Sequence, residues 1–195
     1  MQCNLVTIAR TGGAGGEELG AAVAKALGFR YVDSEIIDLA ATKAGVSATV
    51  VAQAEGRKSL LTRMLENLAL SNFAAPDAPI AVMEAMPDYE RVVVDVIREV
   101  ASQGKVVIVA HGASIPLAGM PGIFRVLVTA STTTRAARMP GGQKAVSDSD
   151  KSRADFLRRF YHLDHELPTH YDLVVNTDVL GTAQATAAVL GAIGG

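Results

Sequence analysis

The sequence predicts a single α/β domain of three layers, in which helices cover both faces of a five-stranded parallel sheet. Its 195 residues are about the usual size of one domain. Apolar residues make up 49% of the chain and aromatic residues only 5%, and aliphatic packing of this kind suits helices layered on a sheet. Short apolar runs alternate with helical patterns, which implies right-handed crossovers between parallel strands.

Five short apolar runs are the predicted strands, because strands that are buried on both faces have continuous apolar sequences. The first run, NLVTIA, leads directly into a cluster of glycines. The predicted strands are residues 4–9, 29–34, 105–112, 123–131 and 171–177.

Apolar residues recur at helical spacing between these strands. Gly28, Gly45 and Gly104 each follow such a pattern, as a C-terminal cap does, and Ser34 precedes one in the position of an N-terminal cap. The predicted helices are residues 17–27, 34–45, 47–70, 88–104, 131–139, 150–165 and 182–193.

Two polar stretches interrupt the core and are predicted to lie at the rim of the sheet where ligands bind in such folds. Residues 46–88 form a helical insertion that ends in an irregular proline-containing segment. Residues 140–168 form a lid that begins with a loop at 140–150. The predicted core consists of residues 1–45, 88–139 and 169–195.

Composition excludes several classes of protein. The net charge of −2 gives no basic surface for a nucleic acid. The lone Cys3 cannot form an internal disulfide and fits a reducing compartment. The chain has no signal-peptide pattern, and its apolar runs are too short to span a membrane. We therefore expect a soluble cytoplasmic protein with neither nucleic-acid nor membrane partners, and its oligomeric state stays open.

The glycine cluster joins the first strand to the first helix in the stretch ARTGGAGGEELG. A phosphate-binding loop has this layout, with backbone N–H groups and the positive end of a helix around the anion. The usual pattern is G-x-x-x-x-G-K-S/T, in which the lysine neutralises a phosphate and the hydroxyl holds Mg²⁺. Here Arg10 and Gly15 occupy the two glycine positions, Gly16 the lysine position and Glu17 the hydroxyl position.

Two other interpretations compete with a phosphate loop. A dinucleotide-binding loop, G-x-G-x-x-G, matches Gly13 and Gly15 but has Glu18 at its third glycine, while Asp33 lies where an acid contacts a ribose. A short-chain dehydrogenase also needs a Tyr-x-x-x-Lys pair, and no tyrosine of this chain is followed by lysine at that spacing. The last alternative is a turn that binds nothing, with acidic residues at the positive end of the helix.

Six segments in order resemble the cytidylate kinase-like family of P-loop proteins, and together they span nearly the whole chain. The glycine loop of that family itself lacks the standard lysine. The segments are VTIARTGGAGGEELGAAVAKALG, FRYVDSEIIDLAATKAGVS, VIREVASQGKVVIVAHGAS, FRVLVTAS, DKSRADFLRRFYHLD and YDLVVNTDVLG.

The resemblance implies a P-loop NTPase-like fold and a phosphotransferase that uses ATP and Mg²⁺. The acceptor would be a nucleoside monophosphate, CMP by resemblance only, bound near Asp33 on the side of the helical insertion. The phosphates of ATP would lie on the loop, over Arg10, Gly12, Gly13, Ala14, Gly15, Gly16 and Glu17.

A closing lid would supply arginines, whose planar fork binds phosphate through two N–H groups at once. Arg135 and Arg138 follow the fourth strand and Arg153 lies on the lid helix, and these three are the predicted catalytic residues. Arg158 and Arg159 are predicted to bind substrate, the alternative being a solvated basic face.

Two departures from the family remove positive charge from the predicted phosphate site. The third strand usually ends in Gly-Arg and here ends in Ala110-His111, and Glu17 stands where the family carries arginine. His111 is predicted to contact substrate, with a structural role as the alternative. We expect lid arginines to replace the missing charge, Arg10 being the other choice. Glu17 would either oppose an anion or hold Mg²⁺, and no other metal ligand is assigned.

The leading functional prediction is therefore a nucleotide-binding phosphotransferase. The alternative is a catalytically impaired nucleotide-sensing or regulatory protein on a kinase scaffold, which the loss of the loop lysine and hydroxyl favours. An NAD(P)-dependent oxidoreductase is the third and least favoured interpretation, because the Tyr-x-x-x-Lys pair is missing.

Overall fold

The computed structural model describes residues 3–33, 35, 36, 39, 43, 89–109 and 112–194. They belong to two compact units, one formed by residues 1–34 and 97–195 and the other by residues 35–96. The predicted insertion at 46–88 lies outside the described residues, as do Ser34 and Gly45. In the second unit, Glu35, Ile36, Leu39 and Lys43 are helical, at positions where the sequence predicts a helix.

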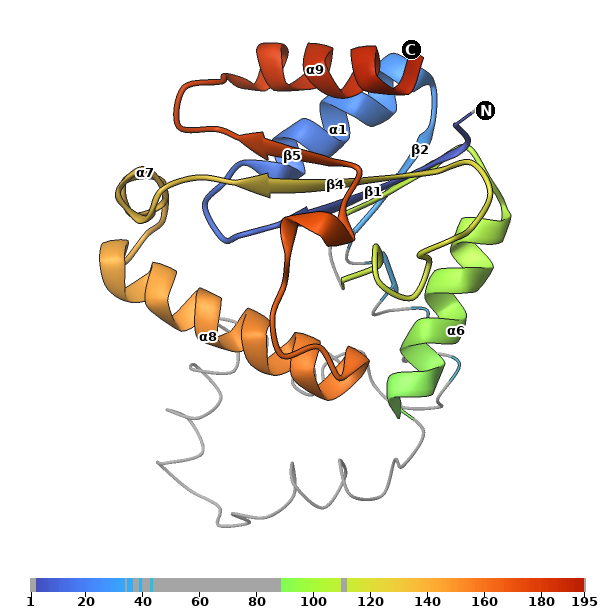
Figure 1. The fold of residues 1–195 in the computed structure, drawn as a ribbon, viewed down its shortest axis with the longest axis horizontal. Coiled ribbons are helices and arrows are strands. Elements are labelled where there is room, and N and C mark those ends of the chain that lie inside the picture. The colour runs from blue at the N-terminus through green and yellow to red at the C-terminus, as the bar shows by residue number, and fades with distance from the viewer. Residues whose placement is uncertain are drawn as a thin grey trace, which may run out of the picture. The chain divides into compact units, whose positions relative to one another are not determined.

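The first unit contains the predicted parallel sheet. Its strands are β1 (Leu5–Arg10), β2 (Arg30–Val32), β3 (Val106–Val109), β4 (Ile123–Thr129) and β5 (Leu173–Asn176). Their order is β2-β3-β1-β4-β5, and every neighbouring pair is parallel (Figure 1). All five predicted strands are confirmed; β1 is shifted by one residue from its predicted range, and the other four are shorter than their apolar runs. The central position of β1 places the glycine cluster that follows it at the middle of the carboxyl edge of the sheet, where α/β proteins bind ligands.

Helices lie on both sides of this sheet, which confirms the three-layer architecture. The helices are α1 (Gly16–Leu27), α6 (Tyr89–Ser102), α7 (Thr132–Arg138), α8 (Gly142–Tyr161) and α9 (Thr182–Gly194). A 3₁₀ turn covers Pro168–His170. α1 and α9 pack against each other over one face of the sheet, and α8 lies on the opposite side (Figure 1).

The main apolar core lies between the sheet and the pair of helices α1 and α9. Side chains alternate along β1, so Val6 and Ile8 enter this core. Thr7 points to the other face, where its hydroxyl shares a buried hydrogen bond of 2.8 Å with Ser114. The other large members of the core are Leu19, Val23, Val107, Val109, Val126, Val128, Val175 and Val189.

The beginning of α8 differs from the sequence prediction. A loop is predicted over residues 140–150, but α8 begins at Gly142, so that prediction is wrong. Of the residues before Asp150 in this helix only Val146 is buried, and no apolar spacing therefore marks it as helical. Lys144 and Asp148, one turn apart, form an ion pair of 2.8 Å that supports this exposed part of the helix.

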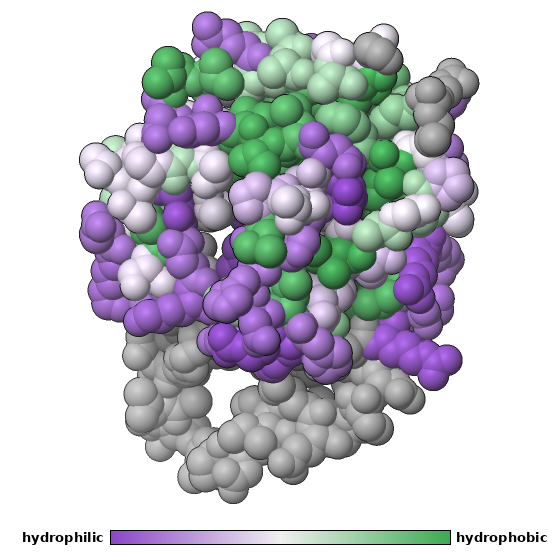
Figure 2. Space-filling model, viewed as in Figure 1, coloured by the Kyte–Doolittle hydropathy of each residue, from purple (hydrophilic) through white to green (hydrophobic). Residues whose placement is uncertain are grey.

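The surface over α8 is hydrophilic, as Figure 2 shows. α8 ends at Tyr161, earlier than predicted, because His162 adopts a left-handed backbone conformation with φ of 51°.

Within the described ranges, no helix has the length and apolar character that crossing a membrane requires.

The close contact between α1 and β3 depends on Gly20. A Cβ atom at this position would lie 2.4 Å from Cγ2 of Val109, which is fully buried. We expect Gly20→Val to lower the free energy of unfolding by about 2 kcal/mol, because overpacked cores lose roughly that amount. Urea unfolding followed by circular dichroism measures the change.

Gly191→Val is the matched control for this substitution. Gly191 lies in α9, and a Cβ atom added to it would have no other atom within 4 Å, so the free energy of unfolding should change by less than about 0.5 kcal/mol. Equal stability of the two variants would show that α1 does not need Gly20 for its approach to the sheet.

Candidate functional site

The glycine loop, residues 10–17, connects β1 to α1 through a tight turn. Gly13 and Gly15 have φ of 79° and 80°, a left-handed conformation that side chains other than glycine rarely adopt. The amide of Thr11 donates to the carbonyl of Val128 at 3.1 Å, and the amide of Ala14 donates to the carbonyl of Thr11 at 3.0 Å. These contacts fix the path of the turn at the end of β1.

Most other amides of this turn have no acceptor among the residues that the structure describes. Gly15 is the N-terminal cap of α1, and its own carbonyl accepts from Leu19 at 3.2 Å. The first turn of a helix carries a positive partial charge, so unpaired amides there form an anion site. Within the part of the chain that the structure describes, no oxygen accepts from the amides of Gly12, Gly13, Gly15, Gly16, Glu17 and Glu18.

Two carbonyl groups of the turn, those of Gly12 and Ala14, are bound by side chains. The Nε of Arg135 donates to the carbonyl of Gly12 at 2.7 Å, and the hydroxyl of Thr177 donates to the carbonyl of Ala14 at 2.8 Å. Arg138 in turn donates to the hydroxyl and the carbonyl of Thr177, at 3.0 and 2.8 Å. The carbonyls are therefore held by the protein, while the amides remain available to a ligand.

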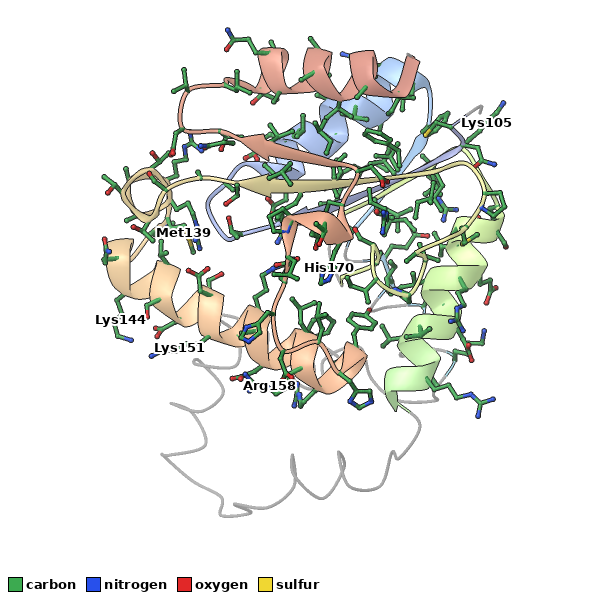
Figure 3. The ribbon with its side chains drawn as sticks, viewed as in Figure 1. Lys105, Met139, Lys144, Lys151, Arg158 and His170 are labelled. Atoms are coloured by element: carbon green, nitrogen blue, oxygen red, sulfur yellow. The ribbon has the colours of Figure 1, made fainter. Side chains whose placement is uncertain are left out.

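Arg135 also ties the loop to α8. It is only 4% exposed, and its two terminal nitrogens donate to the carboxylate of Asp150. Met139 lies between α7 and α8 and packs on Gly13, where a Cβ atom would be 2.8 Å from its Cγ (Figure 3). A Cβ atom at Gly12 would lie 2.4 Å from the hydroxyl of Ser149. The start of α8 thus packs directly on the glycine loop.

Arg10 and Glu17 form an ion pair across the beginning of α1. The distance from Nη2 to Oε1 is 2.6 Å, and the side chains are 20% and 47% exposed. The cation and the carboxylate of the predicted phosphate site therefore partly neutralise each other.

Asp33 follows β2 and lies within electrostatic range of the same region. Burial, followed by the negative charges of Asp33 and Glu17, raises the pKa of Tyr31. The charges of three predicted site residues, Arg10, Glu17 and Asp33, therefore act on one tyrosine. His111 lies outside the described residues.

Arg153 is part of a second cluster of charges, farther along α8. Its Nε donates to Oε2 of Glu166 at 2.8 Å, and the hydroxyl of Tyr171 donates to Oε1 of the same carboxylate. Burial alone would raise the pKa of Glu166, but the hydrogen bonds and charge of Arg153 hold that pKa below its ordinary value. Burial and the charge of Glu166 raise the pKa of Tyr171.

The other two arginines of α8 lie on its surface. Arg158 is 57% exposed and pairs with Asp155 at 3.3 Å and Asp164 at 3.7 Å (Figure 3). The guanidinium of Arg159 lies 5.8 Å from the centre of the Phe160 ring. Of the five arginines predicted for α7 and the lid, Arg135 and Arg138 are thus the ones whose hydrogen bonds reach the glycine loop or its support.

A pocket of about 280 Å³ opens beside the N-terminal turn of α1. Both the glycine loop and the segment after β5 contribute to its wall. The lining residues are Ala14, Gly15, Glu18, Leu19, Arg138, Thr177, Leu180, Gly181, Thr182 and Ala185. A volume of this size suits a small planar group next to the unpaired amides.

Sequence reasoning did not identify Thr177, Asp150 or the pocket wall after β5. Thr177 meets Ala14 only through the fold, since the two are 163 residues apart. Among the residues that the structure describes, no group of three or more His, Cys, Asp and Glu side chains could hold a metal ion.

Comparisons with known proteins place these features in a family. A model of the cytidylate kinase-like family matches residues 5–179. A search of curated proteins found no significant match.

Solved structures share the fold at low sequence identity. An uncharacterized protein from Eubacterium ventriosum has a TM-score of 0.66 at 14% identity, covering 98% of both chains. Shikimate kinase from Bacteroides thetaiotaomicron has a TM-score of 0.52 at 14% identity, covering 96% of this chain and 95% of that one. A gluconokinase from Sinorhizobium meliloti has a TM-score of 0.53 at 12% identity, covering 98% of this chain and 91% of that one.

The contribution of Glu166 to the stability of the fold can be tested by substitution. We expect Glu166→Gln to lower the free energy of unfolding at pH 7 by about 3 kcal/mol, because it leaves the largely buried Arg153 without its charged partner. The folded-state pKa of Glu166 lies below its ordinary value of 4.5. The stabilisation is therefore complete above that ordinary value and is lost as the pH falls through the folded-state pKa.

Urea unfolding of both proteins between pH 7 and pH 3 measures this difference. Asp155→Asn is the control, since it removes a surface ion pair with Arg158 and should cost less than about 1 kcal/mol. A difference between wild type and Glu166→Gln that does not change with pH would contradict the assignment.

Proposed function

Because the chain belongs to the cytidylate kinase-like family, we propose that it is a phosphotransferase that binds a nucleotide with its phosphates on the glycine loop. The proposal rests on how the backbone amides and carbonyls of the loop are hydrogen-bonded. Most of its amides have no acceptor among the described residues, while Arg135 and Thr177 occupy the carbonyls of Gly12 and Ala14. An anion with several oxygens is the ligand that such a set of amides accepts.

The pocket beside α1 supports a nucleotide rather than a simple phosphate. It shares Ala14 and Gly15 with the loop, so a ligand could place a base in the pocket and its phosphates over the amides. We propose ATP as this ligand and a nucleoside monophosphate, CMP by resemblance, as the acceptor near Asp33. Arg158 and Arg159, exposed on α8, are the proposed acceptor contacts, and His111 remains a proposed contact.

Phosphoryl transfer needs positioning and neutralisation of charge on the phosphate oxygens more than it needs covalent help from the protein. The amides and the positive end of α1 would supply part of that neutralisation. Mg²⁺ bound with ATP supplies the rest of the charge, and it usually needs only one or two protein carboxylates in addition to the phosphates. Glu17, at the start of α1, is the proposed carboxylate.

In this proposal Arg135 and Arg138 act as positioning residues. Arg135 donates to the carbonyl of Gly12 and to Asp150, and Arg138 donates to Thr177. Their role would be to hold the loop in the shape that leaves its amides unpaired. Arg153, which pairs with Glu166, would serve the lid helix in the same way.

The second candidate is a nucleotide-sensing protein that does not transfer phosphate. The absence of a side chain at Gly16 and the pairing of Glu17 with Arg10 favour it, because both reduce the positive charge available to a phosphate. Binding would be retained in this case and turnover would not.

A panel of ligands separates these candidates. We expect ATP to raise the melting temperature, and to raise it further as its concentration increases above the dissociation constant, with GTP, CMP, UMP, AMP and NAD(P) tested at the same concentration. A coupled assay of ADP release with ATP and CMP then reports turnover. Stabilisation by ATP with no ADP release supports the sensor, and stabilisation by NAD(P) alone contradicts both candidates.

A substitution in the pocket tests where the base lies. Gly181 lines the pocket, and the nearest atom to a Cβ there is 3.9 Å away, so the site accommodates a side chain. Gly181→Phe should weaken ATP binding about tenfold or more by filling the pocket, with little change in melting temperature. Isothermal titration calorimetry measures the affinity.

Gly191→Phe is the matched control, because the same side chain is added to the open face of α9 away from the pocket. Its affinity for ATP should equal that of the wild type. Unchanged ATP binding by Gly181→Phe would exclude the pocket as the base site.

A further inference from the structure

The side chain of Arg10 occupies the space that a side chain at Gly16 would need. A Cβ atom at Gly16 would lie 2.6 Å from Cβ of Arg10 and 2.8 Å from its Cδ. The first of these atoms is fixed to the backbone of β1 and cannot move aside. Arg10 in its present position therefore requires glycine at residue 16, the position that holds lysine in the usual phosphate-binding pattern.

The guanidinium of Arg10 lies at the first turn of α1 with a buried donor unused. Its Nη2 pairs with Glu17, but its Nε is buried and has no hydrogen-bond partner in the described part of the chain. A buried donor without an acceptor costs free energy, and an oxygen of a bound ligand would remove that cost. The neighbouring amides of Gly15 and Gly16 also lack acceptors among the described residues.

Other arginines near the loop do not have this arrangement. Arg135 directs its nitrogens to the carbonyl of Gly12 and to Asp150, and Arg138 directs its terminal nitrogens to Thr177. These partners are protein oxygens on the carbonyl side of the turn. Among the arginines that the structure describes around the loop, Arg10 is the one whose guanidinium pairs with the first turn of α1, at Glu17.

We infer that Arg10 replaces the missing loop lysine as the phosphate-binding cation, reaching over Gly16 from the end of β1. This inference rests on the proposed function and names the residue that neutralises the phosphate. Glu17 orients the guanidinium through Nη2, and the planar fork of arginine keeps further N–H groups for a phosphate oxygen. Compared with the usual phosphate-binding pattern, glycine and the cation have exchanged places: glycine is at the start of α1, at residue 16, and the cation is at the end of β1, at residue 10.

An exchange of residues tests this directly. The variants are Arg10→Ala, Gly16→Lys and the double variant Arg10→Gly with Gly16→Lys, and the readout is the affinity for ATP and for adenosine by isothermal titration calorimetry. Arg10→Ala should weaken ATP binding about tenfold or more and leave adenosine binding unchanged, because adenosine has no phosphate. Gly16→Lys alone should lower the melting temperature, since it collides with Arg10.

The double variant should recover most of the lost ATP affinity, because glycine at residue 10 has no Cβ atom to collide with the new side chain and a lysine stands at its usual position. Lys25→Ala is the control, since it removes a positive charge from the other end of α1 and should bind ATP as the wild type does. Arg10→Gln serves as a second variant if Arg10→Ala melts at a lower temperature than the wild type.

Each outcome decides the inference. ATP affinity that is unchanged in Arg10→Ala and Arg10→Gln, or equally reduced for ATP and adenosine, overturns it while leaving the proposed nucleotide binding intact. Failure of the double variant to regain affinity also counts against it. A wild-type protein that binds neither ATP nor adenosine defeats the proposed function, and this inference with it.

Discussion

The hydrogen bonds from Arg135 to the carbonyl of Gly12 and from Thr177 to the carbonyl of Ala14 are the constraint on which the site depends. Each residue other than proline has one backbone donor and one backbone acceptor, and both need partners where they are buried. Here side chains bind the carbonyls, so the turn keeps a shape in which successive amides have no partner in the described part of the protein. Left-handed glycines at 13 and 15 make that shape possible.

The same contacts explain why α7 and α8 are built as they are. Arg135 is buried because it bridges the glycine loop to Asp150, and Met139 and Ser149 pack where Gly12 and Gly13 leave no room for a Cβ atom. The beginning of α8 is therefore a support for the loop, and only its later turns carry the exposed Arg158 and Arg159. The arginines of this part of the chain are thus of two kinds: Arg135 holds the glycine loop, and Arg158 and Arg159 lie at the surface.

Much of the fold could be predicted from local sequence. Each buried strand is an apolar run, and the glycine cluster after the first run located the loop, because these features depend on neighbouring residues. The helix at Gly142 was not predictable in this way, since its first turns have almost no buried apolar face. The partners of Arg135, Arg138 and Arg153 could not be predicted either, because Gly12, Thr177 and Glu166 come close to them only in the folded chain.

The central claim is that the amides of the glycine loop receive the phosphates of a nucleotide. Nuclear magnetic resonance of the ¹⁵N-labelled protein tests it most directly, through the amide signals of Gly13, Gly15 and Gly16 during titration with ATP and, separately, with adenosine. The account predicts large shifts of these three signals with ATP and small ones with adenosine. Binding of ATP that leaves all three signals unmoved would contradict it.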